Sequence, residues 1–159
     1  MQYRTGIGFD IHRLVAGRPL FLGGVEIPYD KGLLGHSDGD VLIHALCDAL
    51  LGALALGDIG EHFPDTDPKY KGIASSQLLK TVKGFLDESG YKINNLDAIL
   101  IAQSPSLTPF KKQIKQKLCP LLDIPDSALN IKAKTNEGLG VIGNNEAIAC
   151  YVSASLVKI

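Results

Sequence analysis

The sequence predicts an α+β fold, in which helices pack on one side of a mixed β-sheet within a single domain spanning residues 1–159. Its 159 residues are enough to bury a stable core without disulfides, and 45% of them are apolar. Apolar residues recur at helical spacing in three segments, and β-type segments lie around them. No internal repeat, linker or low-complexity stretch divides the chain. These observations favour one sheet with helices on one face.

The elements alternate along the chain. We expect strands at about 2–10 and 20–27, helices at about 39–55 and 74–88, a strand at about 96–103, a helix at about 108–121, and strands at about 129–135 and 146–157. The first strand is punctuated by glycine. Ser37 or Asp38 can cap the first helix, whereas the second begins at Ser75 and Ser76 and stops at Gly90. The third helix directs several lysines outward, which we interpret as a solvated face.

The composition excludes several classes of partner. A formal net charge of −1 gives no overall attraction to nucleic acid or to an anionic membrane, so any bound phosphate must be met by local groups. No apolar run is long enough to span a bilayer, and no targeting segment opens the chain. Cys47, Cys119 and Cys150 are interpreted as reduced, buried thiols, with Cys47 in the core rather than on a metal. We therefore expect a cytoplasmic protein, or a plastid protein if a transit peptide was removed.

Asp10, His12 and His44 predict a metal site with three protein ligands. Side chains two positions apart on a strand share a face, so Asp10 and His12 can converge on one ion. His44 follows on the first helix, in a polar stripe with Asp40 and Asp48. Structural zinc sites normally have four protein ligands, whereas three ligands leave a position for water or substrate. The pattern therefore favours a catalytic metal.

Two polar segments lie at the ends of other elements. Residues 57–60 and 63–68 form a glycine- and proline-bounded stretch with three carboxylates directly after the metal-bearing helix. This stretch is either an ordinary turn or a loop that contacts sugar hydroxyls or a second cation. Residues 132–137 end a strand in two lysines, a hydroxyl and a carboxylate, which suits a diphosphate with its magnesium.

Seven ordered motifs occur at compatible spacing, at residues 6–12, 22–28, 35–41, 44–53, 57–60, 63–68 and 70–72. In these motifs the chain closely resembles the 2-C-methyl-D-erythritol 2,4-cyclodiphosphate synthase family of the non-mevalonate route to isoprenoid precursors. The resemblance implies a homotrimeric α+β sandwich with active sites between subunits. It also implies a cyclisation, in which the 2-phosphate of 4-diphosphocytidyl-2-C-methyl-D-erythritol 2-phosphate attacks the β-phosphorus of its own diphosphate and expels CMP.

The resemblance also implies roles for individual residues. Asp10, His12 and His44 would hold one Zn²⁺ per subunit, and Glu137 would hold Mg²⁺ or Mn²⁺. His36 and Thr135 would be the catalytic residues that stabilise the transition state. Residues 63–67 would form a flap over the erythritol moiety, and residues 102–108 a cytosine pocket. The implied substrate-binding residues are Ser37, Asp58, Ile59, Gly60, Phe63, Pro64, Asp65, Thr66, Asp67, Ala102, Gln103, Ser104, Pro105, Ser106, Leu107, Thr108, Lys134 and Asn136.

Two other functions stay open from the residues alone. A metal-dependent phosphohydrolase would use the open metal position for hydroxide and would release a linear phosphate. A non-catalytic trimeric binding module would bind the ligand without turnover. The hydrolase is chemically close to the cyclase, because exclusion of water rather than metal ligation decides between the two reactions.

Overall fold

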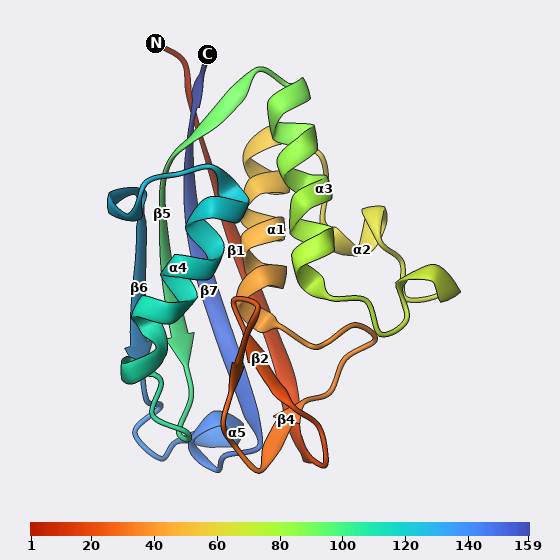
Figure 1. The fold of residues 1–159 in the computed structure, drawn as a ribbon, viewed down its shortest axis with the longest axis vertical. Coiled ribbons are helices and arrows are strands. Elements are labelled where there is room, and N and C mark those ends of the chain that lie inside the picture. Colours follow the sequence, from red (N-terminus) through yellow and green to blue (C-terminus); the bar gives the residue numbers. More distant parts are fainter.

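A five-stranded mixed sheet is the frame of the computed structural model, which describes residues 1–159 (Figure 1). Its strands lie in the order β4-β1-β7-β5-β6. They are β1 (Tyr3–Ala16), β4 (Lys31–Leu33), β5 (Tyr91–Ile101), β6 (Leu129–Lys134) and β7 (Ala147–Lys158). β5 and β6 are parallel, whereas the other neighbouring strands are antiparallel. The expected mixed sheet is confirmed.

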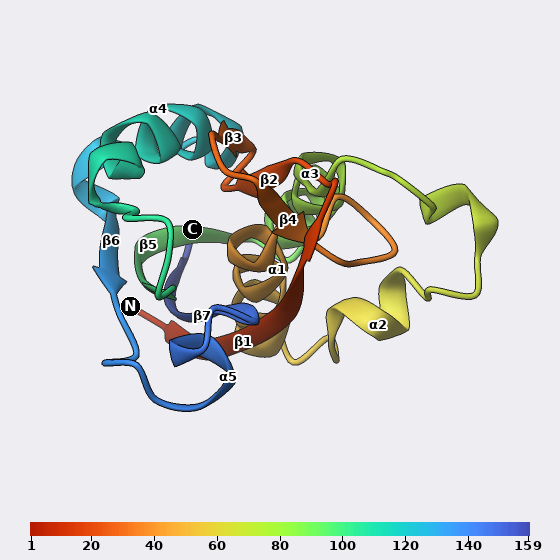
Figure 2. The same ribbon diagram turned by 90° about the horizontal axis from the view of Figure 1, so that it is seen from below.

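Three long helices lie together on one side of this sheet (Figures 1 and 2). They are α1 (Val41–Leu54), α3 (Ser75–Glu88) and α4 (Lys111–Leu122). Shorter helical segments are α2 (Ile59–His62), α5 (Gly140–Gly143) and 3₁₀ turns at Pro68–Tyr70, Thr108–Phe110 and Asp126–Ala128. One continuous apolar core joins the long helices to the sheet, and all three cysteines are free and buried. The α+β class and the burial of the thiols are therefore as the sequence predicts. No helix combines the length and apolarity that crossing a membrane requires.

Two glycines let α1 lie unusually close to β1. A Cβ atom on Gly8 would stand 1.9 Å from the carbonyl oxygen of Ala45, and one on Gly6 would stand 2.1 Å from that of Ala49. No larger residue fits at either position without moving the helix away from the strand. The glycines therefore set the distance between the strand that carries Asp10 and the helix that carries His44.

The expected single strand at 20–27 is wrong, because this segment is a hairpin of β2 (Leu20–Leu22) and β3 (Val25–Ile27). Gly23 and Gly24 form its turn, with φ angles of 61° and 75°. Two-residue hairpin turns favour positive φ at both central positions, which glycine adopts without strain. The pair Gly23-Gly24 was thus a turn signal inside an apolar run.

The cap of the first helix also differs from the expectation. Asp40, rather than Ser37 or Asp38, is the N-cap residue of α1 and accepts a hydrogen bond from the backbone N–H of Ile43. Asp40 is fully buried, and burial raises its pKa to about 6. Its carboxylate also accepts from the N–H groups of the β2–β3 turn, so it holds the hairpin against α1 and does not form a stripe with His44.

Some boundaries shift without changing the architecture. β1 continues to Ala16, so His12 lies inside the strand, and β5 begins at Tyr91 rather than near residue 96. The helix expected from residue 108 has a 3₁₀ first turn before α4 begins at Lys111. Antiparallel pairing explains both strand extensions. β1 pairs with β7 as far as Arg13 and with β4 from Leu14 to Ala16, and β5 pairs with β7 from Tyr91 onward.

Candidate metal centre

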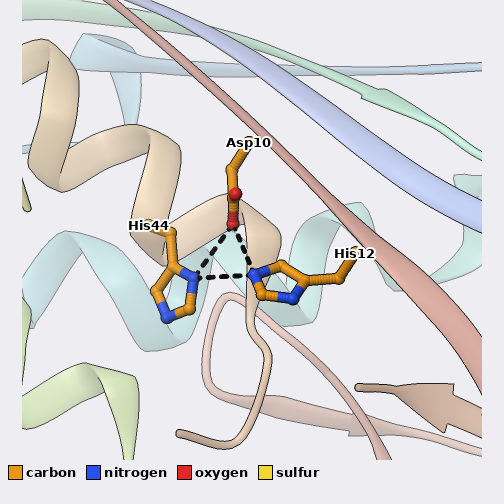
Figure 3. Close-up of side chains that lie close together, drawn as sticks. All are labelled: Asp10, His12 and His44. Carbon is orange, nitrogen blue, oxygen red and sulfur yellow. Dashed lines mark hydrogen bonds and ion pairs between the residues drawn. The ribbon is translucent and has the colours of Figure 1, made fainter. Parts of the chain in front are cut away.

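Asp10, His12 and His44 point toward one another between β1 and α1 (Figure 3). Asp10 Oδ2 lies 3.0 Å from His12 Nε2 and 2.9 Å from His44 Nδ1, and the two nitrogens are 3.3 Å apart. One oxygen and two imidazole nitrogens at this spacing suit zinc or a similar divalent metal. The strand supplies two of these ligands from one face, as the Asp-x-His spacing predicts, and the third comes from the first turn of the helix.

The outer nitrogens of both imidazoles are held by the protein. His12 Nδ1 lies 2.5 Å from the carbonyl oxygen of Leu34, which can only accept a hydrogen bond, so this nitrogen carries the proton. His44 Nε2 lies 2.9 Å from Ser75 Oγ and 3.0 Å from Ser37 Oγ. Partners of this kind fix the ring orientation and leave the opposite nitrogen for a metal. The donor set and its surroundings thus fit a metal ion.

The charges in the centre also favour a cation. Burial raises the pKa of Asp10, but hydrogen bonds and charge from His12 and His44 outweigh burial and hold this pKa at about 2. Burial lowers the pKa of His12, but the Asp10 carboxylate outweighs this effect, and the net shift is upward. Asp10 is therefore an anion at neutral pH and can serve as a metal ligand without losing a proton.

A cavity of about 380 Å³ opens beside the three residues. Its wall includes His36 and Ser37 from the loop before α1, and five predicted site residues from α2 and the segment that follows: Ile59, Gly60, Phe63, Pro64 and Asp65. Figure 2 shows this segment projecting from the body of the molecule. The lining also contains Tyr70, Ile73 and Leu78, which were not among the expected site residues. Tyr70 lies in the 70–72 motif, whereas apolar residues such as Ile73 and Leu78 carry no distinctive signal in the sequence.

Three other predicted residues belong to the same segment but do not line the cavity. Asp58 caps α2 by accepting a hydrogen bond from the N–H of Glu61, and Asp67 accepts one from Lys69. Thr66 lies between them on the exposed loop. In the single chain, two of the three loop carboxylates therefore shape the turn, which is the ordinary role that such residues have.

The remaining predicted residues form a second group at the carboxyl ends of the parallel strands β5 and β6. The N–H of Ala102 donates to the carbonyl oxygen of Lys134 over 3.0 Å, and the N–H of Gly138 donates to Gln103 Oε1 over 3.1 Å. Thr135 Oγ1 donates to Glu137 Oε1 over 3.2 Å. This second group, 102–108 with 134–137, has no residue in the lining of the metal-side cavity. β6 and the α2 segment stand on opposite sides of the chain (Figure 2).

Comparison with protein families decides the assignment, because residues 3–157 match the model of the YgbB family. The chain belongs to the YgbB family. Proteins of Clostridium acetobutylicum and Alkaliphilus oremlandii that are similar to it are both called 2-C-methyl-D-erythritol 2,4-cyclodiphosphate synthase. The first is 57% identical and covers 92% of this chain and 94% of the relative. The second is 54% identical, over 98% of this chain and 99% of the relative.

Solved structures agree with this assignment. A 2C-methyl-D-erythritol-2,4-cyclodiphosphate synthase in a CDP-bound form matches with a TM-score of 0.90 at 39% identity, over 97% of this chain and all of that one (100%). The bifunctional IspDF of Campylobacter jejuni matches with a TM-score of 0.95 at 45% identity. The match covers 99% of this chain but only 43% of the bifunctional one, so this chain is similar to one part of that protein.

Proposed function

We propose that this chain converts 4-diphosphocytidyl-2-C-methyl-D-erythritol 2-phosphate to 2-C-methyl-D-erythritol 2,4-cyclodiphosphate and releases CMP. The observation that carries the proposal is the three-ligand metal centre on the wall of a cavity. Family membership and the synthase relatives define the substrate class, a small molecule linked to cytidine diphosphate. We further propose that residues 1–159 act as one synthase domain.

The substrate carries its own nucleophile, so the protein must fold it back and neutralise its charge. Asp10, His12 and His44 would hold Zn²⁺, and Glu137 would hold Mg²⁺ or Mn²⁺. When bound, these ions would polarise the diphosphate and offset its negative charge. His36 Nε2 is buried beside the cavity without a hydrogen-bond partner, which supports a role in binding a phosphate oxygen. Ser37 would contact the attacking phosphate, and Thr135 would stabilise the transition state.

The segment 58–67 would enclose the erythritol moiety and keep water away from the reacting phosphorus. Phe63 is buried and packs edge-on against Tyr70, with ring centroids 5.4 Å apart, so an apolar wall stands beside the polar centre. Exclusion of water distinguishes this reaction from hydrolysis, which the same metal ligands could support. Residues 102–108 would receive the cytosine, and Lys134 and Asn136 would contact the diphosphate.

Two features support a homotrimer with active sites between subunits. The residues that line the metal-side cavity and the second group lie apart within one chain, so a complete site would take the second group from a neighbouring subunit. The sheet face opposite the helices exposes a patch of large apolar side chains: Ile7 (84%), Phe9 (46%), Ile11 (41%) and Tyr151 (51%). Phe9 and Tyr151 stack with ring centroids 4.6 Å apart. Contiguous exposed apolar surface of this kind is typical of subunit contacts.

Subunit mixing tests the shared site. We expect His44→Ala and Thr135→Ala proteins to be inactive separately and to regain activity after they are dissociated and reassembled together. Some sites in the mixed trimers would then combine an intact metal centre with an intact Thr135. Two samples of the same variant, treated identically, are the control. Absence of recovery in trimers that are verified as mixed would place both groups in one subunit's site.

Phosphorus NMR tests the reaction itself. We expect the protein with substrate and Mg²⁺ to release CMP and a cyclic diphosphate, and a zinc chelator to stop the reaction. Restoring Zn²⁺ should restore product formation, because chelation removes the ion without altering the chain. CMP with only linear phosphates would identify a hydrolase, and binding without any product would identify a non-catalytic module.

Asp48 links the metal-bearing helix to the segment that covers the cavity. Its Oδ1 accepts a hydrogen bond of 2.8 Å from the N–H of Ile59, the first residue of α2. We expect Asp48→Ala to raise KM about fivefold, because one net hydrogen bond contributes about 1 kcal/mol. Asp48→Asn keeps an acceptor oxygen and should stay close to the parent protein in steady-state kinetics. Equal KM values for all three proteins would contradict this role.

A further inference from the structure

On the side of the imidazole ring away from the metal position, His44 begins a series of hydrogen bonds that passes through Ser75 and ends at the carboxylate of Asp38. His44 Nε2 lies 2.9 Å from Ser75 Oγ, and Ser75 Oγ donates a hydrogen bond to Asp38 Oδ1. Ser75 is fully buried at the first turn of α3, and Asp38 lies in the loop before α1. Asp38 is not one of the three residues whose ligand atoms converge on the metal position, and Ser75 meets His44 at its outer nitrogen, Nε2.

We propose that Ser75 and Asp38 are positioning residues that set the orientation and tautomer of His44, and thereby the affinity of the metal centre. The proposal rests on the proposed function, in which His44 Nδ1 is a metal ligand. A ring that offers the Nδ1 lone pair to a metal carries its hydrogen on Nε2. Nε2 therefore donates, and its partner must accept.

Of the two serines near His44 Nε2, Ser75 is the one whose hydroxyl is oriented to accept a hydrogen bond from that nitrogen. Its single hydroxyl hydrogen goes to the Asp38 carboxylate, which can only accept, so its lone pairs face His44. Ser37 Oγ also lies 3.0 Å from His44 Nε2 and 3.3 Å from Ser75 Oγ. Because the Ser75 hydrogen goes to Asp38, Ser37 can donate its own hydrogen to Ser75 Oγ, so its orientation as an acceptor for His44 is not fixed in the same way.

Asp38 is itself fixed by the backbone. Its carboxylate accepts from the N–H of Ser75 over 3.0 Å and from the N–H of Asp40 over 3.1 Å. It therefore ties the start of α3 to the start of α1, where α3 has no side-chain cap of its own. This anchoring gives the hydroxyl of Ser75 one defined position behind His44, as outer partners of metal-binding histidines require.

Metal titration of the apo protein tests the proposal. We expect Ser75→Ala to bind Zn²⁺ about tenfold more weakly, the lower end of the effect of removing an outer partner of a metal ligand. The absorption spectrum of the Co²⁺-loaded protein should change as well, which a purely structural role would not produce. Ser76→Ala, which removes the same group from the next residue of α3, should leave both properties unchanged.

A double-mutant cycle then tests the chain of contacts. Asp38→Asn should weaken Zn²⁺ binding, and the double variant should lose no more affinity than Ser75→Ala alone, because both changes break one path. Additive losses of Zn²⁺ affinity would overturn the proposal. It would also be overturned if Ser75→Ala had the same Zn²⁺ affinity and Co²⁺ spectrum as Ser76→Ala.

If Ser75→Ala does not fold, Asp38→Asn replaces it. A Co²⁺ spectrum of Asp38→Asn that differs from that of Ser76→Ala would support the proposal, and an identical spectrum would overturn it. A parent protein that binds no Zn²⁺ would overturn the proposed function too, whereas a zinc-binding parent with unaffected variants overturns this inference alone.

Discussion

Replacing His44 with alanine is expected to reduce turnover by about 10³-fold or more while the chain remains folded. The change removes one of three ligands, and loss of a group that stabilises developing charge costs about 10²–10³-fold by itself. The apolar positions of α1 that face the core are untouched, so the helix keeps its packing. Turnover by phosphorus NMR, zinc content of the purified protein and thermal unfolding of the metal-free protein measure the three effects.

His62→Ala is the matched control for this change. His62 belongs to α2, and its Nε2 bonds to the carbonyl oxygen of Leu56 over 2.7 Å, outside the metal centre. We expect its zinc content to equal that of the parent protein. Near-normal turnover by metal-stripped His44→Ala protein would show that His44 holds no essential metal.

Asp40→Ala is expected to lower the free energy of unfolding more than any other substitution proposed for this chain. The Asp40 carboxylate accepts three backbone hydrogen bonds, from Gly23, Gly24 and Ile43, at 2.9, 2.7 and 3.1 Å. A buried donor left without an acceptor costs about 1–3 kcal/mol, and the bonds from Gly23 and Ile43 are buried, so their loss alone costs at least about 2 kcal/mol. Domains of this kind are stable by only about 5–15 kcal/mol. Chemical denaturation of the metal-free protein should therefore show a much lower free energy of unfolding.

Asp58→Ala separates this effect from ordinary helix capping. Asp58 is exposed and caps α2 through one hydrogen bond, from the N–H of Glu61 over 3.0 Å. Loss of such a cap costs about 1 kcal/mol. Equal losses of stability in the two variants would mean that Asp40 is only a cap and does not hold the hairpin to α1.

The sequence predicts the residues of the candidate metal centre because their placement depends on short-range patterns, namely alternation along a strand and periodicity along a helix. Alternation along a strand places Asp10 and His12 on one face, and no other part of the fold is needed to see it. Helical periodicity likewise locates α1 and therefore His44. The site also requires β1 and α1 to lie close together, and Gly6 and Gly8 allow this because they have no side chain. Their role is recognised only in the structure, where the helix backbone packs directly against them.

Other features could not be read from the chain because they depend on partners far away in sequence. Asp40 looks like one member of a polar stripe, yet it bonds to Gly23 and Gly24 and is buried. Ser75 looks like the start of a helix, yet its hydroxyl faces His44 on another helix. The separation of the second group from the metal-side cavity depends on the order of the strands in the whole sheet, so no single sequence motif predicts it.

Zinc-edge anomalous diffraction from crystals of the zinc-loaded protein would show directly whether these three residues hold the metal. We expect one strong peak per chain, within bonding distance of Asp10, His12 Nε2 and His44 Nδ1 and with no fourth protein ligand. A peak at other residues, or a site closed by a fourth side chain such as Cys47, would contradict a catalytic metal centre at this position.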